Sequence, residues 1–358
     1  MGLNTDWRIE IHHGIDKEQA SGLSNLIHSL SPPNRQRRSF APEYYLWKLS
    51  QNPSGRGVVA LAVNSKKKIV ASTTGTYKTV WSNQQQRKAC EFGDSYTDPN
   101  YQKQGIMTIL VQKATEAVLQ DGVDIIYTTP NNQSVKGYEA RCSFKTKSNF
   151  PLFFWGLPIS PIFLLSNKYP LFRVFSMFDK LYQKALHLVG LLYKEVEIKP
   201  LYFDEAYDRL NKKMADIYPF LISREASYLQ FRYSINPDFA SYGLVESRDG
   251  IGELEAALIY KKCSQDGMKV LFVADMFGVK RGALSNVWAQ AIKIGRDQGF
   301  HLVAYWGAKN WKMTKIFAPL FPIPVSIKHL LFYTSKSGMK IISEKNDILF
   351  SIGDTDNV

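Results

Sequence analysis

Cysteine and histidine are scarce in this chain of 358 residues, which contains three cysteines and six histidines. Cys90, Cys142 and Cys263 lie far apart and form no metal-binding doublet, and the histidines show no ligand-like spacing. An odd, dispersed set of cysteines argues against a disulfide framework and favours a reducing compartment. We therefore expect no disulfide scaffold and no bound metal, and we expect a cytoplasmic protein.

Other signatures are missing as well. No polar low-complexity tract interrupts a composition that is 45% hydrophobic and 22% charged, so a globular fold is expected. No apolar run lies near Asp6 and Glu10, so a secretory signal is not expected. No Ser-His-Asp or Walker pattern is present. The net charge of +13 is dispersed rather than gathered in a tail, so it attracts anions without selecting among them, and we expect no specific nucleic-acid partner.

One stretch, from Phe150 to Leu165, is strongly apolar. Its three prolines and its short length argue against a membrane-spanning helix. Three interpretations remain open, namely core packing between domains, a wall for an apolar acyl group or acceptor, and peripheral membrane contact. The third is supported by the nearby cations Lys145, Lys147, Lys168 and Arg173.

The chain is long enough for two domains. In the first half, alternation and helical periodicity predict a strand, a helix, a hairpin, a third long strand, a helix and a returning strand. These elements are expected at residues 7–12, 16–30, 58–76, 89–97, 106–119 and 124–129.

The second half repeats parts of this order. The segment 231–237 resembles 47–53, with an aromatic, a basic, a Ser, an Asn and a Pro residue in matching places. A strand at 270–277, a helix at 284–296 and a strand at 302–306 follow in the same order as in the first half. We predict two similar domains, 1–149 and 196–358, joined by a connector at 150–195 that ends in a helical run.

The residues Gln102-Lys103-Gln104-Gly105-Ile106-Met107 lie between a predicted strand and a predicted helix. Backbone N–H groups point outward at a helix start, where the helix dipole also favours an anion. Gly105 lets a phosphate approach the backbone, the two glutamines offer amide donors, and Lys103 adds positive charge. This pattern predicts a pyrophosphate-binding turn.

The segment 98–106 resembles the acetyl-CoA signature of the GNAT N-acyltransferases, in which a strand ends in a Pro-containing segment followed by Arg or Gln, two residues and Gly. Residues 131–144 resemble a later GNAT segment that contains Asn, Ser, Tyr and a closing Phe. Met107 departs from the family, which usually has Gly or Ala there. The resemblance implies an α/β (α+β) fold of two tandem GNAT-like domains, each with a mixed, mostly antiparallel central sheet flanked by helices. The second domain is expected to be degenerate, because 278–283 lacks the signature spacing.

The resemblance also assigns roles. Asn131 or Asn132 would contact the pantetheine arm or the substrate, and Tyr138 would donate a proton to the departing CoA thiolate. Amine attack on a thioester also needs a base and an oxyanion donor. We favour Glu91 over Asp94 as base or water-orienting group, and strand alternation predicts that the two lie on opposite faces. A backbone N–H near 95–97 would bind the oxyanion. The residues expected to bind CoA are Tyr96, Thr97, Gln102, Lys103, Gln104, Gly105, Ile106, Met107, Asn131, Asn132 and Ser134.

The function implied is that of an acyl-CoA-dependent N-acetyltransferase. Acetyl-CoA or another acyl-CoA would be the co-substrate, without a metal, and a small-molecule amine would be the acceptor, such as an amino sugar of a surface-glycan pathway. Two alternatives remain open: a catalytically silent CoA- or ligand-binding module, and a basic protein of the membrane surface.

Overall fold

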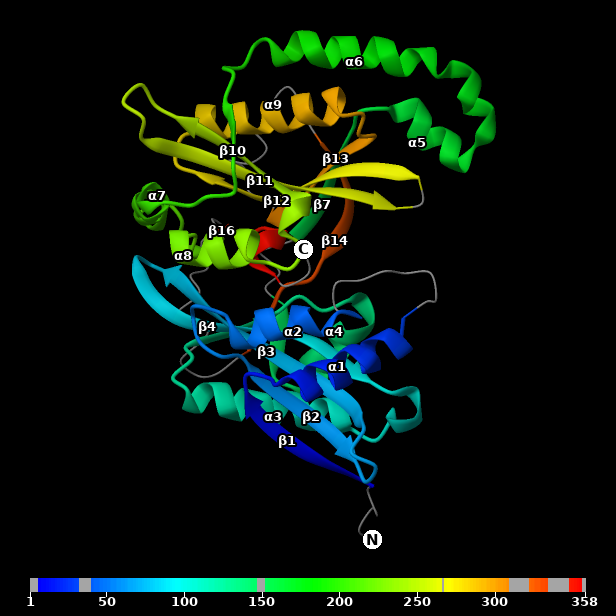
Figure 1. The fold of residues 1–358 in the computed structure, drawn as a ribbon, viewed down its shortest axis with the longest axis vertical. Helices are drawn as coiled ribbons and strands as arrows, with labels where there is room; N and C mark the ends of the chain where they lie inside the picture. The colour runs from blue at the N-terminus through cyan, green and yellow to red at the C-terminus, as the bar shows by residue number, and fades with distance from the viewer. Residues whose placement is uncertain are drawn as a thin grey trace. The chain divides into compact units, whose positions relative to one another are not determined.

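The computed structural model describes residues 6–31, 40–146, 152–265, 267–308, 322–333 and 348–355. The chain forms two units (Figure 1). The first is built from residues within 1–148, 227–238 and 329–343, and the second from residues within 149–226, 239–328 and 344–358. Both units therefore combine segments from distant parts of the chain, whereas the sequence predicted contiguous domains separated by a connector.

The first unit contains a mixed sheet with the strand order β1-β2-β3-β4-β5-β15-β6. Only β4 and β5 pair in parallel, and the other neighbours are antiparallel. β2 is buried along its whole length because helices cover both faces of the sheet. The strands are β1 (Trp7–His13), β2 (Val58–Asn64), β3 (Ile69–Ser82), β4 (Gln85–Thr97), β5 (Ile125–Thr128), β6 (Phe144–Thr146) and β15 (Leu331–Tyr333).

Two layers of helices flank this sheet (Figure 1). On one face, α1 and α2 bury Leu23, Ile27 and Trp47 against the strands. On the other face, α3 buries Leu110 and Ala114, at the spacing that an amphipathic helix requires. The helices are α1 (Lys17–Ser29), α2 (Pro42–Ser50), α3 (Ile106–Gln120) and α4 (Asn132–Arg141), with a short turn at Pro99–Tyr101.

The two copies of the repeated sequence motif pack against each other in the first unit. The Trp47 ring stacks on Phe231 with 4.8 Å between ring centroids, and Trp47 Nε1 donates a hydrogen bond to the Phe231 carbonyl at 3.0 Å. Asn52 Oδ1 accepts a hydrogen bond from the backbone N–H two residues later, and Asn236 Oδ1 does the same. The motif therefore marks the same local structure twice, in α2 and in the helical segment α8 (Ala226–Leu229) with its continuation Gln230–Ser234.

The second unit has the strand order β8-β10-β11-β12-β13-β7-β14. Its strands are β7 (Leu152–Pro158), β8 (Glu197–Lys199), β10 (Tyr242–Arg248), β11 (Leu254–Gln265), β12 (Met268–Gly278), β13 (Leu302–Ala308) and β14 (Ile323–Lys328), and a small parallel pair is formed by β9 (Phe220–Ile222) and β16 (Ile348–Leu349). Its helices are α5 (Pro161–Lys168), α6 (Met177–Gly190), α7 (Glu205–Ala215) and α9 (Arg281–Asp297), with short turns at Pro170–Phe175, Phe239–Ser241 and Ile352–Asp354.

The two sheets follow one plan, in which antiparallel strands lead to a single parallel pair, β4–β5 or β12–β13. The strand beside the parallel pair comes, in each sheet, from a distant part of the chain. β7 follows β6 in the chain but pairs with β13 and β14, while β15 follows β14 but pairs with β5 and β6. The predicted fold class, with two similar mixed sheets, is confirmed.

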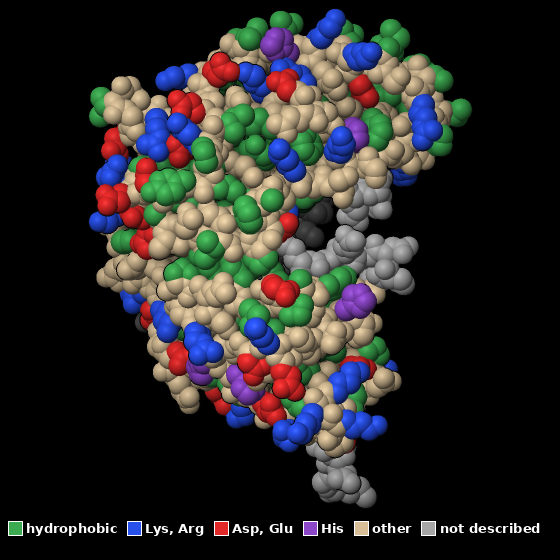
Figure 2. Space-filling model, in the orientation of Figure 1, with side chains coloured by type: hydrophobic (Ala, Val, Ile, Leu, Met, Phe, Trp, Pro, Cys, Tyr) green, Lys and Arg blue, Asp and Glu red, His purple; other side chains and the backbone are tan. Residues whose placement is uncertain are grey.

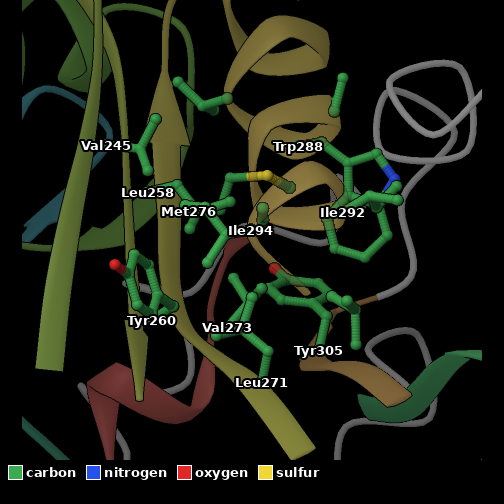
Figure 3. Packing of buried hydrophobic residues seen from close by; sticks show 14 of the residues in the cluster. Val245, Leu258, Tyr260, Leu271, Val273, Met276, Trp288, Ile292, Ile294 and Tyr305 are labelled. Atoms are coloured by element: carbon green, nitrogen blue, oxygen red, sulfur yellow. The ribbon is translucent and has the colours of Figure 1, made fainter. Parts of the chain in front are cut away.

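The core of the second unit forms between α9 and its sheet. Figure 3 shows Trp288 and Ile292 of α9 beside Leu258, Val273 and Met276 of the strands, and all five are buried. β7 lies in the same sheet, and its residues Leu152, Trp155 and Leu157 are buried. This part of the hydrophobic run from Phe150 to Leu165 is therefore core within the second unit, whereas the sequence suggested core packing between domains.

A buried ionic cluster holds three segments of the second unit together. The Arg224 guanidinium lies 3.1 Å from Asp275 Oδ1 on β12 and 2.7 Å from Asp354 Oδ2 near the C-terminal end. Ser351 Oγ donates to Asp275 at 2.9 Å. All three charged side chains are at most 3% exposed, so each charge depends on the others for its compensation.

Candidate active site

The end of β4 separates from its parallel neighbour. Ladder pairing with β5 runs from Ala89 opposite Ile125 to Phe92 opposite Thr128, while β4 continues beside β3 as far as Thr97. The backbone of the last part of β4 is thus not engaged by β5. This separation occurs in the strand that leads to the predicted phosphate turn.

A β-bulge lies at the same place. Gly93 pairs with Thr74 and Tyr96 pairs with Ser72, so that Asp94 and Ser95 together oppose a single residue of β3. Asp94 adopts a positive φ of 46°. A bulge shifts the alternation of side chains by one position, and it re-aims residues next to functional sites.

The predicted phosphate-binding turn leads directly into α3. Gly105 has φ +77°, and a Cβ at this position would meet nothing within 4 Å, so the backbone is open at the helix start. The first turn of α3 contains no acidic residue, and no side chain caps it. Lys103 is exposed, also with a positive φ. The helix start can therefore offer backbone N–H groups to an anion, as the sequence predicts.

The remaining side chains of the turn have specific places. Gln102 Nε2 donates to the Thr97 carbonyl at 3.2 Å, and Gln104 Oε1 accepts from Trp7 Nε1 at 3.1 Å. Ile106 is buried. Met107, the departure from the family pattern, packs against the hydrophobic core on the α3 side of the sheet. Its bulk is therefore accommodated by the core.

Tyr138 on α4 reaches the bulge. Its hydroxyl lies 2.8 Å from Ser95 Oγ, and the side chain is only 2% exposed. Burial raises the pKa of Tyr138 to about 12, against the opposing effect of hydrogen bonds with Ser95 and with Thr128 at the end of β5. A protonated hydroxyl is thus held where the two parallel strands separate.

The segment that begins α4 uses its polar side chains locally. Asn131 Oδ1 caps the helix by accepting from the backbone N–H groups of Gln133 and Ser134, at 3.0 and 2.9 Å. The Asn132 side-chain oxygen lies 3.1 Å from His329 Nε2. Asn131 and Asn132 are exposed and Ser134 is half-buried, and Tyr96 and Thr97 at the end of β4 are half-buried too.

Glu91 and Asp94 lie on the opposite face of the sheet from Tyr138, on the side of α2. Glu91 is paired with Lys78 at 3.1 Å, and both side chains are almost fully buried. Asp94 is paired with Lys48 of α2 at 2.6 Å. Gly93 lies two residues after Glu91 and so points to the same face of β4, and a Cβ on Gly93 would lie 3.6 Å from the Lys48 ammonium. Glu91 therefore points to the face that Lys48 occupies.

The two carboxylates therefore share a face, and the prediction that they lie on opposite faces is wrong. The reason is the bulge, which inserts one residue between them and restores the parity. Neither carboxylate is a freely solvated strand residue, because each contacts a buried lysine.

Four functional candidates were missed by the sequence reasoning, namely Lys48, Lys78, Ser95 and Thr128. Lys48 stands in the repeated motif, and Lys78 alternates with Thr76 and Thr74 along β3. A polar, alternating face on an otherwise buried strand was the signal that could have identified the lysines. Within the described ranges, no cluster of His, Cys, Asp and Glu could hold a metal ion.

The second unit keeps the bulge but not the rest of the site. When the parallel pairs β12–β13 and β4–β5 are aligned, Val273 corresponds to Phe92, and the register of β12 shifts just after Val273. In the same alignment Met276 takes the place of Ser95. α9 begins at Arg281 without a glycine of positive φ, and Lys280 pairs with Glu255. The hydroxyl and the glycine of positive φ are thus both lost, although Gly282 in the first turn of α9 has open space around it.

Comparisons with known proteins agree with this geometry. Residues 23–144 match the model of the acetyltransferase (GNAT) family. A GCN5-related N-acetyltransferase from Anabaena variabilis superposes with a TM-score of 0.60 at 12% identity, covering 91% of this chain and 72% of that one. N-myristoyltransferase from Saccharomyces cerevisiae, solved with bound myristoyl-CoA, gives a TM-score of 0.62 at 9% identity, covering 93% and 84%.

A probable N-acyltransferase from Enterococcus faecalis gives a TM-score of 0.58 at 11% identity, covering 92% of this chain and 72% of that one. No curated protein matches the sequence. At these identities the structural likeness concerns the fold, while the family match concerns the residues that carry the turn, the bulge and Tyr138. Residues 23–144 therefore match the acetyltransferase (GNAT) family, and the chain as a whole has the fold of these acyltransferase structures.

Proposed function

We propose that the first unit transfers an acyl group from acyl-CoA to a primary amine. The observation that carries the proposal is the separation of β4 from β5. The Tyr138 hydroxyl lies where the two strands begin to separate, and the Gly105 turn follows the end of β4. The turn would bind the CoA pyrophosphate, and the thioester would lie near the separation. Backbone N–H groups of the last part of β4 would serve the oxyanion.

The reaction forms a carbon–nitrogen bond and breaks the carbon–sulfur bond, and the proton lost by the amine balances the proton gained by sulfur. Glu91, or a water that it orients, would accept the amine proton. Tyr138 would donate a hydrogen bond to the departing sulfur, which takes its proton from solvent, while Glu91 releases the amine proton to solvent. A thiol ordinarily has a pKa near 8.5 and is therefore more acidic than Tyr138, whose pKa is about 12. The contribution of Tyr138 is thus a hydrogen bond that strengthens as thiolate charge develops.

The finer proposal is acetyl transfer from acetyl-CoA to an amino sugar. Isothermal titration with acetyl-CoA and longer acyl-CoAs, followed by a free-thiol assay across amino sugars, amino acids and polyamines, tests it. Absence of CoA binding at millimolar ligand would overturn the whole proposal, and binding without turnover on every acceptor would leave a silent CoA-binding module. The departure at Met107 and the shifted place of Tyr138 favour that module on sequence grounds, and the packing of Met107 against the core weakens the first of these two arguments.

Gly105→Ala tests the phosphate turn. The new methyl group would occupy the open space over the backbone, where a phosphate has to approach, and we expect the Kd for acetyl-CoA to rise about tenfold. The substitution also carries a backbone cost of about 1 kcal/mol because φ is positive.

Gly122→Ala is the matched control. Gly122 follows the other end of α3, has φ +75°, and would also place its Cβ in open space. It should lose the same stability and keep its affinity for CoA. Equal affinities in the two variants, measured by titration, would show that the turn does not bind the cofactor.

Tyr138→Phe tests the hydrogen bond to sulfur. We expect kcat to fall about 100-fold with little change in KM, because the hydroxyl acts mainly when thiolate charge develops. Since the pKa of about 12 keeps the hydroxyl protonated, this group should add no alkaline limb to the rate profile between pH 7 and 9. Ser95→Ala, which removes the hydrogen-bond partner but leaves the phenol, is the control, and a variant Tyr138→Phe with unchanged kcat would contradict the assignment.

A further inference from the structure

The segment from α5 through Pro170–Phe175 to α6 has an unusual surface. Its large hydrophobic side chains face outward, and Leu171 and Val174 in the connecting turn are 85% and 76% exposed. The other exposed hydrophobic residues of this segment are Leu165, Tyr169, Phe172, Phe175, Met177, Phe178, Leu181, Leu188, Leu191 and Leu192. Figure 2 shows hydrophobic and basic side chains together along the upper edge of the view, over α6. A contiguous set of this kind marks an interaction surface, and we call it the α5–α6 surface.

Helix α6 carries hydrophobic residues on its outer side as well as on its inner side. Tyr182, Leu186 and Val189 pack inward on the hydrophobic core, as expected for an amphipathic helix. Met177, Leu181 and Leu188, at helical spacing, are nevertheless exposed on the outer side. An ordinary surface helix would carry polar residues there, so α6 is apolar on two sides.

The charge of the α5–α6 surface has one sign. Residues 161–194 contain the cations Lys168, Arg173, Lys180, Lys184 and Lys194 and one acidic residue, Asp179. Asp179 is buried, and its two carboxylate oxygens accept hydrogen bonds from the backbone N–H groups of Ile162 and Phe163. It therefore joins α6 to the start of α5 and is withdrawn from the surface, which presents only positive charge among hydrophobic groups.

A groove between α6 and α9 adds a second feature. It has a volume of about 480 Å³ and is lined by Lys180, Gln183, Lys184, His187 and Arg296. Lys180 and Lys184 supply its positive charge, because Arg296 is paired with Asp297 at 2.7 Å, and the exposed Leu181 and Leu188 lie on the same helix as the lysines. Such a groove suits a phosphate group whose attached chain is apolar.

We propose that the α5–α6 surface docks on a bilayer that carries anionic phospholipid. Basic side chains mixed with aromatic and aliphatic ones, at the face of a helix that lies flat, are the composition that binds the headgroup region. No helix in the described ranges is both long and apolar enough to cross a membrane, which fits contact from one side only. The hydrophobic turn with Leu171 and Val174 would enter between the headgroups, and the lysines would pair with phosphates.

A second copy of the chain fits the surface less well. A two-fold symmetric contact brings the same patch of both subunits together, so the cations of one copy would face those of the other without an acidic partner. The proposal rests on the second unit and does not depend on acyl transfer. It also narrows the membrane contact expected for the run from Phe150 to Leu165 to the part that begins with α5, since β7 is part of a sheet.

The test is flotation of the full chain with vesicles of phosphatidylcholine, alone or mixed with about one-third phosphatidylglycerol. We expect binding to the anionic vesicles that salt weakens but does not abolish, because part of it is apolar. Leu171→Ser combined with Val174→Ser should weaken the partition coefficient at least about tenfold. Lys180→Gln combined with Lys184→Gln should weaken it about tenfold on anionic vesicles only.

Ile251→Ser is the matched control for the apolar change, because Ile251 is 87% exposed in the turn between β10 and β11 of the same unit. Lys66→Gln with Lys67→Gln, in the exposed turn between β2 and β3, is the control for charge. Both controls should float with the vesicles as the unaltered chain does. Failure to float, equal loss in the controls, or a dimer in sedimentation that Leu171→Ser dissociates would overturn the proposal.

Discussion

Arg224→Met is expected to lower the free energy of unfolding of the second unit by about 3–5 kcal/mol, the usual cost of breaking a buried ion pair from one side. The guanidinium lies between Asp275 and Asp354, and it also donates to the Ile222 carbonyl at 2.6 Å. Methionine fills much of the same volume but leaves two buried carboxylates without their cation. Chemical denaturation followed by circular dichroism measures the loss.

The loss should depend on pH in a defined direction. Burial raises the pKa of Asp354 to about 6, against the lowering effect of Arg224. A carboxyl group with a raised folded-state pKa stabilises the fold while it is protonated, and this contribution disappears as pH rises through that value. Without Arg224 the Asp354 carboxyl group should hold its proton more tightly still, so we expect the variant to lose most stability at about pH 7.5 and to regain part of it at about pH 5.

Arg209→Met provides the comparison. Arg209 makes an ion pair with Glu253 at 3.2 Å, but its side chain is about half exposed, so the same substitution should cost no more than roughly 0.5 kcal/mol. If Arg224→Met cost as little as Arg209→Met, or if its loss grew toward low pH, the buried cluster would not hold the C-terminal segment as described.

Local patterns in the sequence predicted most helices and strands but not the sheet to which each strand belongs. The alternation in β1 and the helical spacing of α3 depend on near neighbours, so both appear at their predicted places. The exchange of β7 and β15 does not, since each strand pairs with residues that are distant in sequence. β7 was interpreted as part of a connector because a strand buried on both faces has a continuous apolar sequence, without the alternation that identifies a strand.

The site shows the same division. The Gly105 turn was predicted because its chemistry lies in consecutive residues, and the structure places an open backbone there. The relation between Glu91 and Asp94 was not predicted, because alternation assumes an unbroken ladder and the bulge adds one residue to β4. Lys48 and Lys78 reach the same face from α2 and β3, and such pairing between elements is invisible in one sequence.

Glu91→Gln is expected to lower kcat by about 1,000-fold if Glu91 accepts the amine proton. The substitution has a second effect, because the Lys78 ammonium loses its carboxylate counter-ion at 3.1 Å while its side chain is only 1% exposed. We expect the free energy of unfolding to fall by about 3–5 kcal/mol, as for any buried pair broken from one side.

Combining Glu91→Gln with Lys78→Met separates these effects. Removing the ammonium leaves no uncompensated charge, so most of the lost stability should return, while kcat should stay low because the base is still absent. Recovery of kcat together with stability would instead mean that Glu91 only neutralises Lys78. The pair Asp94→Asn with Lys48→Met is the matched control on the same face, and it should keep kcat near that of the unaltered chain. If kcat collapsed in that control while the double variant of Glu91 and Lys78 kept its activity, the base would be Asp94 rather than Glu91. Asp94 is the carboxylate that the bulge brings to the same face of the sheet.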